Sequence, residues 1–174
     1  MSTPIPNVCN AIRRILLNQA GITTLLLPQT ALAGLTIAPI FAFNYPRKVA
    51  GQPATGYTGH DWAALLNQKS IRLVLITPSG RVASGGDSSR APWSRPRIDI
   101  QCYGRTEDDA MTVHLAIEAF LKELSNARAA LTGGTALVHD VTVEGGPLLF
   151  PDPDTDAPIA TGIYAASFAE QYVA

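Results

Sequence analysis

The sequence predicts an α+β fold. We expect a single domain over residues 1–174, with a mostly antiparallel or mixed sheet of roughly four to five strands, an N-terminal helix and one long amphipathic helix. Three observations favour it. A chain of 174 residues suits one hydrophobic core. The segments 70–77 and 95–103 have strand patterns, and the segment after Thr106 has apolar residues at helical spacing.

The first element is an N-terminal amphipathic helix. Asn7 is suited to cap it and Gly21 to end it. Between them the residues that recur on one helical face are Val8, Ala11, Ile12, Ile15 and Leu16. We expect a second short helical piece over 22–27 that stops at Pro28, and then a strand over 36–44.

Residues 21–43 are apolar enough to resemble a membrane span. Pro28, Gln29 and Pro39 interrupt this segment, whereas a spanning helix needs about 20 uninterrupted apolar residues. The first six residues also lack the basic and apolar regions of a secretory signal. We therefore expect no membrane partner.

Two strands flank a long polar loop. Residues 70–77 carry apolar side chains on both faces, which indicates a central position in the sheet. Residues 79–94 are rich in serine, glycine and arginine, and we expect them to form the exposed, flexible tip of a long β-hairpin. The second strand covers 95–103. In it Ile98, Ile100 and Cys102 alternate with Asp99, Gln101 and Tyr103, which predicts one buried and one wet face. Residues 47–67 fit no element.

The second half begins with a long helix. Thr106 and Asp109 have the spacing of a capping box, and acidic residues favour the positive end of a helix. The apolar stripe that follows consists of Ala110, Val113, Ile117, Phe120, Leu121 and Leu124. Beyond it we expect a strand over 136–143, a proline-rich excursion over 147–158 and a closing strand over 162–173.

The low charge of the chain points to subunit contacts. Charged residues make up 16% of it and apolar residues 47%, whereas an average soluble domain is about 25% charged. Part of the apolar surface is therefore expected to be buried against other subunits. The alternative is an ordinary surface on a chain rich in alanine and proline.

The charge balance argues against a nucleic-acid binder. The net charge is −1, and phosphate affinity needs a basic face. Five arginines nevertheless crowd one stretch: Arg81, Arg90, Arg95, Arg97 and Arg105. We interpret them as a solvated basic loop, with no specific nucleic-acid binding.

Motifs for catalysis, cofactors or metals are not recognisable. Asp152, Asp154 and Asp156 alternate as in a calcium loop, but the glycine and glutamate that the loop requires are replaced by Ala157 and Ile163. The three histidines have no ligand or acid-base spacing, and there is no nucleophile elbow or phosphate loop. Cys9 and Cys102 are expected to be free thiols. We therefore assign no catalytic, cofactor-binding or metal residue.

The chain resembles the tail-terminator, or tail-completion, proteins of long-tailed bacteriophages and related tail-like particles. The features that carry the resemblance are the strand 97–104, the helix start 106–110, and the acidic turn 152–156 followed by the strand 163–168. The N-terminal amphipathic helix and the hairpin before the strand add to it. Residues 47–67 do not match the pattern.

The resemblance implies a structural virion protein of the tail and neck. Such proteins form a ring, usually of six subunits, that caps the tail tube, ends its polymerisation and presents a docking surface to the head. The implied partners are further copies of the chain, the tail tube protein and a head-side neck or connector protein, with DNA passing through the ring. The ring would assemble in the host bacterial cytoplasm.

We expect the subunit or tube contacts to lie on the hairpin and on the wet face of its second strand. The residues concerned are Arg81, Arg90, Trp93, Arg95, Arg97, Asp99 and Tyr103. Two other interpretations stay open. One is another head–tail connector or stopper of the same assembly, and the other is a small-ligand binder or enzyme, which would have a closed, polar-lined pocket.

Overall fold

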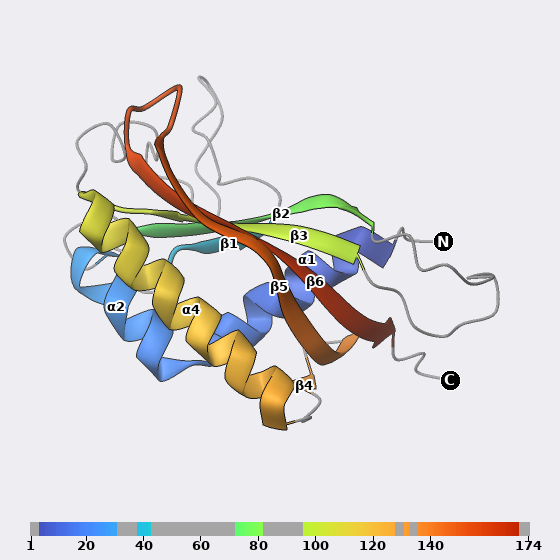
Figure 1. Ribbon diagram of the computed structural model, residues 1–174. Coiled ribbons are helices and arrows are strands. Elements are labelled where there is room, and N and C mark those ends of the chain that lie inside the picture. The colour runs from blue at the N-terminus through green and yellow to red at the C-terminus, as the bar shows by residue number, and fades with distance from the viewer. Residues whose placement is uncertain are drawn as a thin grey trace, which may run out of the picture.

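The computed structural model describes residues 4–30, 38–42, 72–81, 96–127, 131–132 and 136–170. They form two layers, a mixed sheet and a layer of helices that covers one of its faces (Figure 1). The strand order in the six-stranded sheet is β1-β2-β3-β6-β5-β4. The predicted α+β fold is thus confirmed.

The N-terminal helices differ from the prediction at their ends. Helix α1 spans Pro4–Leu17 and α2 spans Ala20–Thr30. The first helix begins before Asn7 because Pro4 and Pro6 fall in its first turn, where the missing N–H groups need no partner. The first helix ends before Asn18, whose amide donates to the carbonyls of Arg14 and Ile15. Gly21, which was expected to end this helix, lies inside α2. The second helix also continues past Pro28.

The first three strands lie side by side in the order of the chain. Strand β1, Ile40–Ala42, runs parallel to β2, Leu73–Arg81, and β2 runs antiparallel to β3, Pro96–Tyr103. The central position predicted for 70–77 is confirmed. Residues 79–81 of the expected hairpin tip belong to β2, and the rest of the tip, residues 82–94, lies outside the described residues, as does the unassigned stretch 47–67.

The long helix follows its predicted pattern closely. Helix α4 spans Glu107–Ala127, and the amide of Asp109 donates to Oγ1 of Thr106 at 3.1 Å, as a cap should. The chain turns into it at Gly104, where an added Cβ would lie 2.4 Å from the amide nitrogen of Ala110. The whole apolar stripe is buried except Phe120, which is half-buried.

The last two strands are longer than predicted. Strand β5 spans Ala136–Pro151 and β6 spans Pro158–Glu170, and the two are antiparallel neighbours. The expected proline-rich excursion over 147–158 is therefore wrong for half of its length, because 147–151 and Pro158 are strand and only 152–157 form a turn. Pro147 and Pro151 are tolerated because this part of β5 has an open edge in the described sheet, and Pro158 because it is the first residue of β6. We call residues 144–163 the arm: its β6 half stays paired with β3 from Ile159 onward, and the far end of the hairpin curves away from the sheet (Figure 1).

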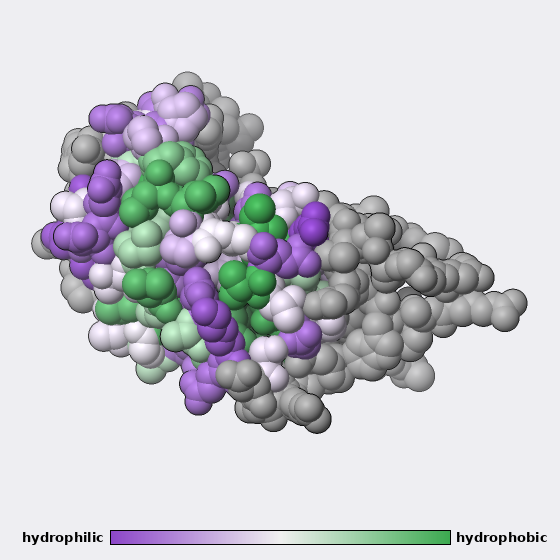
Figure 2. Space-filling model, in the orientation of Figure 1, coloured by the Kyte–Doolittle hydropathy of each residue, from purple (hydrophilic) through white to green (hydrophobic). Residues whose placement is uncertain are grey.

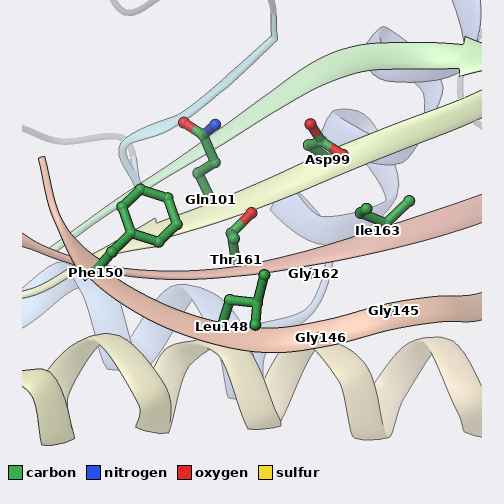
Figure 3. A pocket seen from close by; sticks show the side chains of 9 residues that line it. All are labelled: Asp99, Gln101, Gly145, Gly146, Leu148, Phe150, Thr161, Gly162 and Ile163. Carbon is green, nitrogen blue, oxygen red and sulfur yellow. The ribbon is translucent and has the colours of Figure 1, made fainter.

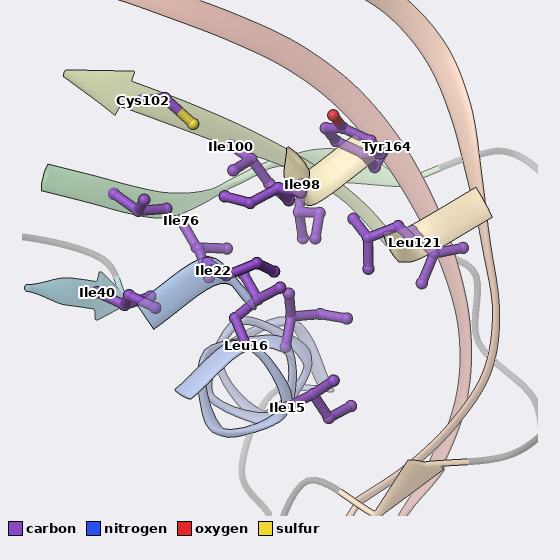
Figure 4. Packing of buried hydrophobic residues seen from close by; sticks show 14 of the residues in the cluster. Ile15, Leu16, Ile22, Ile40, Ile76, Ile98, Ile100, Cys102, Leu121 and Tyr164 are labelled. Carbon is purple, nitrogen blue, oxygen red and sulfur yellow. The ribbon is translucent and has the colours of Figure 1, made fainter. Parts of the chain in front are cut away.

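The core fills the space between the sheet and the helices (Figure 4). Side chains from α1, α2 and α4 meet those of β1, β2, β3 and β6, and Tyr164 is the largest fully buried residue. The remaining short strand, β4, spans Leu131–Thr132 and pairs only with Leu137 and Val138 of β5. The helices that the structure describes all lie on this side of the sheet.

Candidate functional site: the outer sheet face and the arm

The face of the sheet opposite the described helices, which we call the outer face, carries a shallow pocket. Pairing places Asp99 of β3 opposite Ile163 of β6, and Gln101 opposite Thr161. Thr161 in turn lies opposite Leu148 of β5. Together with Phe150 and the glycines 145, 146 and 162, these side chains enclose about 160 Å³. Figure 3 shows the side chains standing on the same side of the three strands.

Large apolar side chains are exposed beside this pocket. The exposed fractions are 61% for Leu148, 42% for Leu149, 40% for Phe150 and 39% for Ile163. Successive side chains of a strand point to opposite faces, so Leu148–Phe150 expose apolar surface on both sides of the arm. Figure 2 shows an apolar patch below a hydrophilic end of the molecule. A run of exposed apolar residues of this kind indicates a contact surface.

The arm also has an open edge. Strand β4 pairs with β5 only as far as Val138. From Asp140 to Pro151, the outer edge of β5 has no partner strand in the part of the chain that the structure describes. Such an edge presents backbone donors and acceptors to a further strand. The open edge and the apolar side chains therefore occur in the same segment.

The acidic turn at the end of the arm holds itself together. Oγ1 of Thr155 donates to a carboxylate oxygen of Asp152, and the amide of Asp156 donates to the carbonyl of Asp152 at 2.8 Å. Asp152 is largely buried by these contacts. No group of three or more His, Cys, Asp or Glu residues within the described ranges is placed to bind a metal ion. The turn thus uses its first carboxylate for its own structure.

Arg97 anchors the base of the arm on the outer face. Its Nε donates to a carboxylate oxygen of Glu144, across the intervening strand β6. Ala165 lies opposite Arg97 in the register and is fully buried. Arg97 is exposed, as expected for the wet face of β3.

The other residues predicted for the interface have different outcomes. Asp99 lies half-buried on the outer face. Tyr103 is a correction, because only 4% of it is exposed. It shares a row of the sheet with Leu73 and Ile159, which are also buried, and its hydroxyl donates to Oε1 of Gln101 at 3.3 Å. Arg81 ends β2. Arg90, Trp93 and Arg95 lie outside the described residues.

A buried polar cluster lies between β6 and α4. His114 of α4 is fully buried, with Nε2 at 3.4 Å from the Tyr164 hydroxyl and 3.5 Å from Oε2 of Glu118. Burial lowers the pKa of His114, against the opposing charge of Glu118. Burial likewise raises the pKa of Tyr164 and that of the Cys102 thiol. These shifts favour the uncharged forms of His114, Tyr164 and Cys102.

Sequence reasoning missed the exposed apolar residues of the arm. The signal was the run Leu148–Phe150 between Pro147 and Pro151. Prolines at both ends favoured a loop, which concealed the strand between them.

Comparisons with known proteins do not identify a family or function for this chain. No protein-family model matches the chain, and no curated protein matches it either. Among the described helices, none is long and apolar enough to cross a membrane.

Proposed function

We propose that this chain is a structural assembly protein whose copies form a ring at the end of a phage tail tube. The ring ends polymerisation of the tube and presents a docking surface to the head-side neck. The proposal starts from the resemblance of residues 97–110 and 152–168 to tail terminators.

The exposed arm is the observation that carries the proposal. Three consecutive large apolar residues, Leu148–Phe150, stand in solvent on a strand with an open edge. An isolated subunit gains nothing from this arrangement, because exposed apolar edges promote association. A neighbouring subunit would cover it, as the low charge of 16% also suggests.

The shape of the arm suits contact between neighbours in a ring. Its far end projects beyond the sheet (Figure 1), and we propose that it contacts a different surface of the next copy. Contacts between two different surfaces repeat around a ring when the rotation closes. Each interface should bury more than about 1,000 Å².

The first experiment is light scattering on the purified chain over a range of concentrations, followed by negative-stain imaging with and without tube protein. A ring that stops tube growth would support the proposal. A ring that binds a neck protein and leaves the tube growing would favour a connector or stopper. A monomer that does neither would overturn the assembly role.

The predicted hairpin tip has its own test. Because β2 pairs through Arg81 with Pro96, residues 82–95 can be replaced by a short turn without touching the described strands. Loss of capping with an unchanged melting temperature would support a tube contact by the tip. Capping at full efficiency would exclude that contact.

A further inference from the structure

We infer that the outer-face pocket binds a basic side chain from a second copy of this chain, and that this side chain is Arg14. The inference rests on the proposed ring and assigns one of its subunit contacts. The pocket supplies the acidic half of the contact, and α1 of the neighbour supplies the basic half.

The volume of the pocket suits a single side chain. Small-molecule sites usually enclose about 300–1,000 Å³, whereas this pocket encloses about 160 Å³. A cavity of about 150 Å³ accommodates a group the size of benzene. The pocket therefore has room for one side-chain head and little more.

The lining of the pocket selects a cation with a flat head and an apolar stem. Among the described residues that line it, Asp99 is the only ionisable one and none is basic. The oxygens of Gln101 and Thr161 add acceptors, and Phe150 offers an aromatic face (Figure 3). A guanidinium group donates several hydrogen bonds in one plane and stacks on aromatic rings. Arginine fits this lining better than an anion or an aliphatic group does.

The carboxylate of Asp99 has an unsatisfied hydrogen-bond acceptor. Its Oδ1 is shielded from solvent and has no hydrogen-bond partner in the described part of the chain. A shielded carboxylate oxygen without a donor is costly. Arg97 does not supply the donor, since its Nε is directed to Glu144. A donor brought by another molecule would remove this cost.

Arg14 is the matching cation on the surface of the same chain. The other basic side chains that the structure describes have hydrogen bonds: those of Arg13, Arg72, Arg97, Arg105 and Lys122. Arg14 is exposed, and no hydrogen bond or ion pair engages it in the described structure. It is thus the described cation that is open to a partner.

The two halves of the contact lie on opposite sides of the subunit. The pocket opens on the outer face, and α1 belongs to the helical layer on the other face (Figure 1). One molecule cannot join them, whereas successive copies can. A contact of this head-to-tail type generates a ring or a filament. The exposed Leu148 and Ile163 at the rim of the pocket would be buried by the same neighbour.

The test is a double-mutant cycle on self-association, measured by sedimentation equilibrium of the full chain up to millimolar concentration. The variants are Asp99→Asn, Arg14→Gln and the double substitution. Asp108→Asn and Lys122→Gln are the controls, because they change the net charge by the same amounts at exposed sites of α4. Circular dichroism melts verify that each variant folds.

We expect each single substitution to weaken association at least about tenfold, and the double substitution to weaken it no further than either single one. The controls should stay near wild type. Unchanged association of Asp99→Asn, or losses that simply add, would overturn the contact and leave the ring proposal standing. A wild-type chain that stays monomeric even with tube protein would overturn both.

Discussion

Gly162 of β6 packs against the imidazole of His114 so closely that a Cβ at position 162 would lie 2.7 Å from its Cε1. Tyr164 closes the same space from the other side, at 3.1 Å from that Cβ. The missing side chain therefore lets β6 approach α4, and His114 fills the gap. This contact fixes the hairpin on the helical layer at the point where the arm begins.

A methyl group at this position should be destabilising. We expect Gly162→Ala to lower the free energy of unfolding by about 1–3 kcal/mol, because the imidazole and the tyrosine ring are both buried and have little room to move. Gly145→Ala is the matched control, since its Cβ would meet only Ile163, at 4.0 Å. Urea unfolding curves of the two variants measure the difference. Equal stability of both would contradict the tight packing.

The buried histidine should make stability depend on pH. Burial lowers the pKa of His114 in the folded state below its ordinary value of about 6.5. Above pH 6.5 both states hold a neutral ring, so there is no penalty. Below it the unfolded chain takes up a proton that the folded chain excludes, so stability falls as the pH drops from about 6.5 towards the folded pKa. Urea unfolding between pH 7.5 and 5 measures this slope.

His114→Gln is the control for the pH effect. Its absolute stability will differ from that of wild type, but its slope over the same pH range should be flatter. Carboxylates do not obscure this comparison, because they titrate mainly below pH 5. An identical slope in the two proteins would exclude His114 as its source.

The exposed apolar residues of the arm should affect association more than stability. We expect Leu148→Ser combined with Phe150→Ser to reduce self-association and dye binding to exposed apolar surface, while the unfolding free energy changes by less than about 1 kcal/mol. Leu115→Ser is the matched control, because Leu115 is exposed as well but lies on α4, which contributes no residue to the pocket lining. An equal effect of the control would mean that general hydrophobicity causes the association.

The ion pairs of Asp109 should differ in strength according to burial. Arg72 donates to Asp109 at 2.6 Å and to the carbonyl of Leu25 at 2.8 Å, so it links α4 to α2. We expect Arg72→Met to lower the unfolding free energy by about 1–3 kcal/mol. Arg105→Met removes a more exposed partner at 2.7 Å and should lower the unfolding free energy less than Arg72→Met does. Thermal melts of both variants show which substitution lowers stability more.

The same carboxyl group should contribute to acid sensitivity. Burial opposes ionisation of Asp109, yet its bonds to Arg105 and Arg72 hold its pKa below the ordinary value. A depressed acid pKa stabilises the fold above the unfolded value of about 3.9 and loses this effect as the pH falls through the folded pKa. Asp109→Asn should therefore flatten the stability curve below pH 4 and leave its slope above pH 5 unchanged.

Local pattern was enough to predict the elements at the centre of the fold. The alternation around Ile98 and Ile100 gave the buried face of β3, and the spacing of Val113, Ile117 and Leu121 gave the buried face of α4. These side chains touch the core, so burial and period agree. The cap at Thr106 was also predictable, because it depends on neighbours in sequence.

Features that depend on distant contacts were not predictable. Tyr103 follows the alternation of β3 but lies in a row whose neighbours, Leu73 and Ile159, are buried as well. The strand through Pro147 was hidden because only its position at an edge makes proline acceptable there. The pocket brings Asp99 to Leu148 through the intervening strand β6, a proximity that no local spacing encodes.

Different parts of the hairpin are subject to different evolutionary constraints. Leu148, Leu149 and Phe150 are exposed and are not part of the core cluster, whereas Tyr164 on the continuation of the same hairpin is wholly within it. Substitutions in the outer part can therefore accumulate with little penalty for folding, and the scaffold can remain constant while its recognition of partners diverges. Related chains adapted to different tails would be expected to vary most between Pro147 and Pro151 and least around Gly162.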